Sequence, residues 1–397
     1  MYLLEKILAT FVAVSPIKYL CGTFVYFNIF FPLVGLVQFF RFRNIPFLFY
    51  PIIVSCFFNL IICFWHLAPA ESYFRVIQLF LIIYGAIYVS SRSDDFLPTL
   101  ILRVFFPVLV VDFLFFLSFY FFENASHTRN IFGFVVPRYV GLAGDPNFSG
   151  MLCAVASMIL FSFRKRVNFF VGMVIVFISL FTFSRTVFIV YFVFSLGMLM
   201  RRELFKIYCW FFLFLVFLFP VSLLLVDSYV SVDDKIYLTK ITSARYPFWV
   251  AYCTLGIQSP LGCGYFNSLE NALDFIDMDL LLHDDLSGYV NQGLIRKDGV
   301  RAVFIEQHSL QLQVLSDFGV VGYLSLWCLI FVLVWALLQS NNKKVLIIIS
   351  SLVGYTFINA MSEWALWCSI GFSCSLLPLR FSWRDLSFGS VDLYHDS

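Results

Sequence analysis

Arginines at the ends of apolar segments are the residues of this sequence best suited to chemistry. Arg75 lies near the end of one such segment, Arg138 precedes the stretch 141–147, and Arg185 stands in the short break 182–186 between two others. A guanidinium stays charged when it is dehydrated and binds phosphate oxygens through two parallel hydrogen bonds. Each arginine could therefore bind a pyrophosphate, or act as a snorkelling anchor or a lipid-headgroup contact.

A long hydrophilic stretch, 227–310, carries a second set of candidates. It contains Arg245, and it ends in Glu306 and His308 immediately before an apolar segment. The sequence therefore places His308 at a membrane boundary, where it could transfer a proton or simply make structural hydrogen bonds. No second histidine, cysteine or carboxylate stands at a metal-ligand spacing around it, so we expect no metal.

Asp112 and two cysteines each allow two interpretations. Asp112 is the ionisable residue closest to the middle of an apolar segment, and such residues are functional candidates because charge is costly in lipid. A protonated Asp112, or a pair with Arg103, explains its position as well. Most of the ten cysteines lie in apolar stretches, where they pack as small hydrophobic residues. Cys253 and Cys263, in the hydrophilic stretch, either form a disulfide or are free and buried.

The composition indicates the scaffold that must position these side chains. Of 397 residues, 61% are hydrophobic and 13% are charged, and the mean hydropathy is +0.91. So little charge cannot cover a water-facing surface, and it gives no support for nucleic-acid binding. We expect an all-α, polytopic integral membrane protein with about twelve transmembrane helices. They are predicted at 3–17, 19–40, 45–65, 72–90, 97–122, 146–163, 167–183, 186–200, 207–226, 311–338, 345–362 and 364–379.

Lysines and arginines in the short connections predict the orientation. One set of alternate connections is rich in them and must be cytoplasmic, so both termini lie inside the cell. That set contains Arg41, Arg43, Arg92, Arg164, Lys165, Arg166, Arg201, Arg202, Lys206, Lys343, Lys344, Arg380 and Arg384. The opposite side of this single transmembrane domain, 1–397, holds a large loop, 227–310, and a smaller one, 123–145. Arg138 and Arg185 on that side run against the topological bias, so they need a second explanation.

Five short motifs follow one another along residues 138–322. They are Arg138-Tyr139-x-Gly141 with Gly144-Asp145-Pro146-Asn147, then Phe183-Ser184-Arg185-Thr186, then Arg245 with Trp249, then Ser259-Pro260-x-Gly262-x-Gly264, and then His308 followed by Leu310 and Gly319 to Gly322. In this order they resemble the O-antigen polymerase and ligase family of bacterial membrane glycosyltransferases. One departure is His308-Ser309, where many relatives have His-Asn. The first motif also offers a helix start, with Asp145 or Asn147 as the cap.

The resemblance implies glycosyl transfer at the periplasmic face of a Gram-negative inner membrane, from an undecaprenyl-pyrophosphate-linked oligosaccharide. The protein must then neutralise the leaving pyrophosphate and deprotonate an acceptor hydroxyl. The residues assigned to the pyrophosphate are Arg75, Arg138, Arg185 and Arg245. His308 is the candidate base and Glu306 is its rival. The donor is already activated, so no cofactor is expected, and no phosphate-binding or dinucleotide fingerprint is present. The lipid bilayer and a chain-length regulator are candidate partners.

Several functions are consistent with this interpretation. A polymerase joins repeat units on the lipid carrier, whereas a ligase moves finished chains to the lipid A core. We favour a polymerase by analogy alone, because polymerases are the more numerous and varied group. Transfer of an oligosaccharide to protein is a third option. A transporter or flippase of lipid-linked sugar would also need cationic groups, but the inverted repeats typical of that class are not visible. A scaffold without catalysis would leave the outward arginines unexplained.

Overall fold

The computed structural model describes most of the chain between residues 50 and 357. The described residues are 50–68, 70, 72–74, 76–77, 79–81, 96–121, 128–131, 134–141, 145–163, 165–242, 245–264, 268–277, 280, 309–339 and 342–357. The helices predicted at 3–17, 19–40 and 364–379 lie outside these residues, as does most of 72–90.

Most of the described residues are helical, as the composition predicted. The helices are α4 (Tyr50–Trp65), α6 (Phe96–Leu100), the π-helical turn η2 (Ile101–Phe105), α7 (Phe106–Phe121), α8 (Pro146–Phe161), α9 (Arg166–Leu180), α10 (Arg185–Leu199), α11 (Arg202–Phe217), α12 (Phe219–Tyr229), α13 (Val232–Ile241), α14 (Tyr246–Gln258), α15 (Ser268–Ala272), the 3-10 turn η4 (Leu273–Phe275), α18 (Leu310–Gln339) and α19 (Val345–Tyr355). One antiparallel pair of strands, β1 (Thr128–Ile131) and β2 (Phe134–Pro137), occupies part of the predicted smaller loop.

Helix positions follow the predicted apolar segments. The segments at 146–163, 167–183 and 186–200 correspond to α8, α9 and α10. The segment at 207–226 is instead two helices, α11 and α12, which meet at an angle of 57°. Pro220 in the first turn of α12 explains the break, because proline cannot donate a backbone hydrogen bond to the preceding helix.

The number of membrane spans is not confirmed in the described part of the chain. By length and composition, two helices there could cross a membrane, Pro98–Ser118 and Leu310–Gln339, and the bent pair of α11 and α12 would make a third. Other apolar helices are shorter, with 10–17 residues each. The protein is therefore mostly helical, with two or three candidate membrane spans among the described residues.

The packing is inverted relative to a water-soluble protein. The central helix α8 is buried along nearly its whole length, including Ser149 and Ser157. The surrounding helices instead turn large apolar side chains outward, such as Phe170 on α9, Phe192 on α10 and Phe211 on α11, which are 71%, 65% and 59% exposed. Apolar exteriors around buried polar groups are typical of helices that face lipid.

The stretch 227–310 is not simply a hydrophilic loop, because part of it packs into the helical bundle. Helix α14 is mostly buried and lies against α18, with which it makes one of the most extensive helix contacts. Its 13 residues give a length of about 20 Å, too short to cross about 30 Å of hydrocarbon. Cys253 on α14 and Cys263 just after it are both free and buried, so they form no disulfide.

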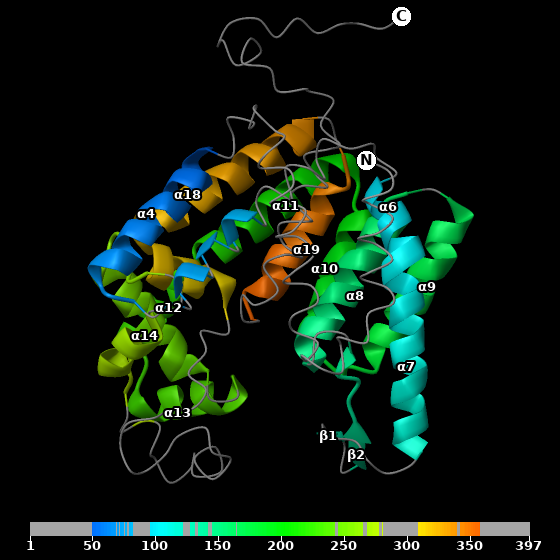
Figure 1. Ribbon diagram of the computed structural model, residues 1–397, viewed down its shortest axis with the longest axis horizontal. Helices are drawn as coiled ribbons and strands as arrows, with labels where there is room; N and C mark the ends of the chain where they lie inside the picture. The colour runs from blue at the N-terminus through cyan, green and yellow to red at the C-terminus, as the bar shows by residue number, and fades with distance from the viewer. Residues whose placement is uncertain are drawn as a thin grey trace, which may run out of the picture.

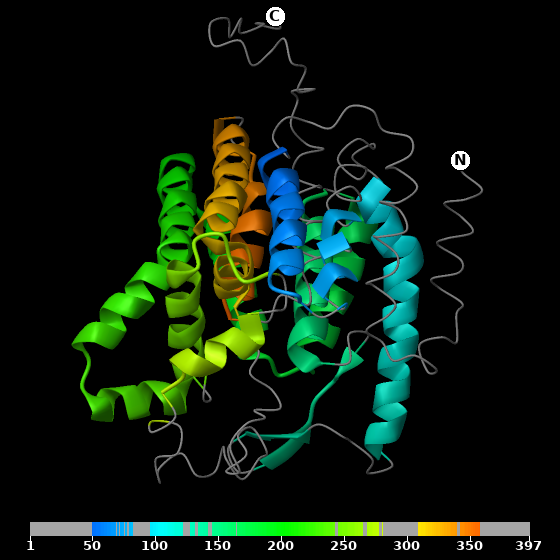
Figure 2. The same cartoon turned by 60° about the vertical axis from the view of Figure 1, so that its left-hand side comes forward.

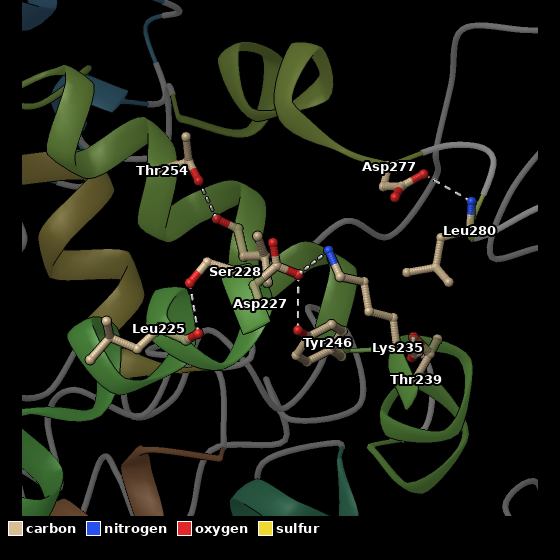
Figure 3. Close-up of polar contacts among 10 residues, drawn as sticks. Leu225, Asp227, Ser228, Lys235, Thr239, Tyr246, Thr254, Asp277 and Leu280 are labelled. Carbon is tan, nitrogen blue, oxygen red and sulfur yellow. Dashed lines mark hydrogen bonds and ion pairs between the residues drawn. The ribbon is translucent and has the colours of Figure 1, made fainter. Parts of the chain in front are cut away.

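One polar cluster joins the three helices at the start of this stretch. The Asp227 carboxylate accepts a hydrogen bond of 2.9 Å from the Tyr246 hydroxyl and pairs with the Lys235 ammonium at 2.9 Å (Figure 3). These residues come from α12, α14 and α13, in that order. The cluster therefore fixes the turn that brings the chain from the bent span back to α14.

Two glycine motifs far apart in sequence meet in one backbone contact, here called the glycine contact. Gly319 interrupts α18 with φ +69°, and Gly262, with φ +84°, lies directly against it. The N–H groups of Cys263 and Gly264 donate to the carbonyls of Ser316 and Asp317, both at 3.1 Å. The segment 259–264 thus satisfies backbone groups that the break in α18 releases.

Candidate functional site

Arg138 forms a hydrogen-bonded network with the turn between α9 and α10. Its Nε donates to the Thr182 carbonyl at 2.9 Å, and its Nη2 donates to Asn147 Oδ1 at 3.3 Å. Ser184 Oγ donates to the same Asn147 oxygen at 2.9 Å. The motifs 138–147 and 183–186, which the sequence singled out separately, therefore come together in one Arg138–Asn147–Ser184 network.

Asp145 begins α8 within the same region. Its Oδ1 accepts hydrogen bonds from the backbone N–H groups of Asn147 at 2.7 Å and Phe148 at 3.1 Å. Pro146 follows in the first helical position, where its missing N–H costs nothing. The predicted helix start at Asp145-Pro146-Asn147 is thus confirmed, with Asp145 as the cap.

Arg185 is the first residue of α10, and its side chain is exposed. No hydrogen bond or ion pair joins this side chain to any residue that the structure describes. The preceding residue, Ser184, makes no capping bond to the helix, because its hydroxyl is directed to Asn147. The start of α10 therefore combines a cationic side chain with backbone N–H donors that lack a side-chain cap, and both favour an anion.

Arg245 precedes α14 and is partly buried. Its Nη1 donates to the carbonyl of Phe357, just beyond α19, at 3.1 Å. Burial lowers the pKa of the Arg245 guanidinium, the negative charge of Asp145 raises that pKa, and the positive charge of Arg185 lowers it further. Arg245 is thus close enough to Arg185 and Asp145 for their charges to act on it, and the two charges change its pKa in opposite directions.

The structure therefore brings three of the predicted arginines into one region, here called the arginine site: Arg138, Arg185 and Arg245. Arg138 donates two of its hydrogen bonds to protein oxygens, so its main role is to position the turn before α10. Arg185 and Arg245 repel one another, and the negative charge of Asp145 acts in the opposite direction on Arg245. Two cations that repel one another favour an anionic ligand between them, and a pyrophosphate has the charge and the oxygens to bridge them.

The other predicted site residues, Arg75, Glu306 and His308, lie outside the described residues. The chain is described again from Ser309, which is buried and precedes α18. Within the described residues, no three His, Cys, Asp or Glu side chains gather as a metal ion would need. Those residues thus offer cationic and amide groups to a ligand, and no metal-binding set.

Two contacts near the arginine site were missed from the sequence. The Asp112 carboxylate on α7 accepts a hydrogen bond of 2.6 Å from the hydroxyl of Tyr139, the residue that follows Arg138. The backbone N–H of Tyr139 donates to Phe181 at 2.8 Å, beside the Arg138–Thr182 bond. Asp112 thus has a structural role, because it holds Tyr139 in place. The sequence also did not show that the side chain of Asn147 joins Arg138 to Ser184. The sequence signal for Asp112 was its position within an apolar segment, and the signal for Asn147 was the short motif 144–147.

No protein-family model, curated protein or solved structure matches the chain. The geometry of the arginine site is therefore the main basis for a functional proposal.

Proposed function

We propose that the chain is a membrane glycosyltransferase of the O-antigen polymerase type, which transfers an oligosaccharide from undecaprenyl pyrophosphate to an acceptor repeat unit. The observation that carries the proposal is the arginine site, where the charges of Arg185, Arg245 and Asp145 act on one another beside the Arg138–Asn147–Ser184 network. A donor whose leaving group is a pyrophosphate matches this charge. The order of the motifs along the sequence supports the same class.

The reaction requires one displacement at the anomeric carbon. The acceptor hydroxyl oxygen forms a bond to that carbon while the bond to the phosphate oxygen breaks, and the pyrophosphate leaves on its lipid carrier. Arg185 and Arg245 stabilise the negative charge of the leaving group. His308 takes the hydroxyl proton, with Glu306 as the alternative base. A single displacement inverts the anomeric configuration.

The proposed setting is a Gram-negative inner membrane, with the arginine site at the periplasmic face and both termini in the cytoplasm. The apolar exterior of α9, α10 and α11 supports a membrane location. Figure 1 shows β1, β2 and α13 at one end of the molecule, and Figure 2 agrees. This supports placing the stretches 123–145 and 227–310 on one side of a chain with about twelve spans.

A transporter of lipid-linked sugar is the second candidate, because the described chain contains a broken helix at Gly319 and a bent pair at Leu218. In transporters, such breaks leave backbone groups that bind the substrate. Here the carbonyl of Asp317, beside the break, accepts hydrogen bonds from Asn59 and Gly264 at 2.7 and 3.1 Å. The break is therefore used for packing, which favours an enzyme with a fixed site.

The pattern of surface polysaccharide tests the proposed reaction. Cells that lack the gene are complemented with the wild type or with His308→Ala, and lipopolysaccharide is separated on a gel. We expect the His308 variant to give only core plus one repeat unit, because no second unit can be joined. Loss of all O-chain with lipid-linked polymer still accumulating would instead indicate a ligase. An unchanged ladder in the deletion strain would contradict both and favour the transporter.

Cysteine labelling tests the proposed orientation. Asp274 is exposed in η4, so Asp274→Cys should react with a membrane-impermeant maleimide added to the periplasmic side. Arg201→Cys, exposed before α11 on the proposed cytoplasmic side, should react only after permeabilisation. Ser268→Cys, in the same loop as Asp274 but buried against Asp317, should stay unlabelled. The reverse accessibility of Asp274 and Arg201 would overturn the topology.

A further inference from the structure

The orientation of the Asn147 side-chain amide is determined by its neighbours. An arginine guanidinium can only donate hydrogen bonds, so the Asn147 atom that faces Arg138 must be the oxygen. Ser184 donates to the same oxygen. The Nδ2 amino group therefore occupies the other position of the amide, with two N–H donors of its own.

These two donors have no hydrogen-bond partner among the residues that the structure describes. Asn147 lies in the first turn of α8, and its oxygen is joined directly to the residue that precedes Arg185. Arg185 itself begins α10 with an exposed side chain, and no side chain caps the first N–H groups of the helix. The amide thus adds neutral donors to a region already rich in donors and cations.

We infer that Asn147 binds the substrate directly, with its Nδ2 donating to a non-bridging phosphoryl oxygen of the pyrophosphate. The inference rests on the proposed function, because it adds a binding residue to the same arginine site. Asn147 then has two tasks that use opposite ends of one amide. Its oxygen holds Arg138 and Ser184 in place, while its nitrogen binds the ligand.

Replacing Asn147 by aspartate separates these tasks. Asn147→Asp keeps an oxygen that can accept from Arg138 and Ser184, but it removes both N–H donors and places a negative charge toward the phosphate. If the residue only held the network together, the variant would lose affinity only through its added charge, and that loss would shrink as salt screens the charge. The loss of two donors would instead persist at high salt. If Nδ2 binds phosphate, we expect affinity to fall about tenfold or more while thermal stability stays near that of the wild type.

Binding to the purified full-length protein in detergent provides the measurement. Undecaprenyl pyrophosphate in mixed micelles and inorganic pyrophosphate are titrated separately into the wild type, Asn147→Asp and Asn342→Asp. Asn342 is a matched control: its Oδ1 also accepts a hydrogen bond, in this case from the backbone N–H of Lys344 at 3.0 Å, but it lies in the turn between α18 and α19. The same chemical change there should leave both affinities within about twofold of the wild type.

The outcomes distinguish this inference from the proposed function. Wild-type binding to either probe with a loss confined to Asn147→Asp supports the inference, and tighter binding of the lipid-linked probe identifies the carrier as the source of the phosphate. Equal binding by the wild type and Asn147→Asp would overturn the role of Asn147 and leave the proposed function intact. No binding of either probe by the wild type would overturn the anion site itself, and this inference with it.

Discussion

Arg185→Lys should lower the rate of glycosyl transfer by about 100-fold or more, the usual cost of removing a donor that stabilises developing negative charge. Lysine keeps the positive charge but cannot form two parallel hydrogen bonds to a phosphate group. Because the Arg185 side chain is exposed and makes no hydrogen bond or ion pair with the described residues, the substitution should hardly affect folding. The rate is measured with purified protein and a lipid-linked repeat unit, and folding is monitored by size-exclusion chromatography.

Arg202→Lys is the matched control for this variant. Arg202 is also the exposed first residue of an apolar helix, α11, but the predicted topology puts it at the cytoplasmic face. An anchoring arginine can be replaced by lysine at either face, since both side chains snorkel. Full activity of both variants would therefore make Arg185 an anchor as well and remove the central residue of the proposed site.

The sequence was most informative where local chemistry decides the structure. Asp145 and Pro146 predicted the start of α8 because a carboxylate cap and a proline in the first turn act within a few residues of one another. The starts of α9 and α10 were predicted to within one residue from the length of their apolar runs. The number of spans could not be confirmed in the same way, because several described helices are shorter than the thickness of a bilayer.

Helix α14 shows why part of the fold was missed. A search for apolar segments of about 20 residues overlooks a helix of this length, and the polar residues around it suggested a loop. Its buried face became visible only through its contact with α18. The partners of Arg245 and Asn147 are likewise separated from them by 112 and 37 residues, at Phe357 and Ser184. Such contacts depend on the arrangement of whole helices, which a single sequence does not reveal.

The two glycine motifs are a further contact between distant segments that the sequence did not predict. The sequence singled out 259–264 and 319–322, but it gave no reason to place one against the other. In the structure the two backbones approach so closely that only glycine fits at each position. A Cβ on Gly319 would overlap the carbonyl oxygen of Pro260, and one on Gly262 would overlap that of Asp317. Both glycines have a positive φ, a backbone angle that residues other than glycine adopt only with strain.

Gly262→Ala should therefore destabilise the protein by about 3 kcal/mol or more, from a strained backbone and a steric overlap together. The overlap is with backbone, which cannot rotate away as a side chain can. Separation of the segment 259–264 from α18 would also leave the carbonyls of Ser316 and Asp317 without the N–H groups that now bind them. The expected result is a lower melting temperature and less monodisperse protein in detergent.

Gly354→Ala provides the comparison that isolates the cause. Gly354 is also a close-packed glycine, but it lies within α19 with ordinary helical geometry, and an added Cβ would meet side-chain atoms of Met151 and Val190. The flexible thioether of Met151 can shift, although the branched side chain of Val190 yields less easily, and alanine favours the helix more than glycine does. A loss of stability in Gly262→Ala well beyond that in Gly354→Ala would attribute the effect to the glycine contact. Equal melting temperatures for the two variants would mean that 259–264 is not held against α18, and that the break at Gly319 is available for another role, such as binding a transported substrate.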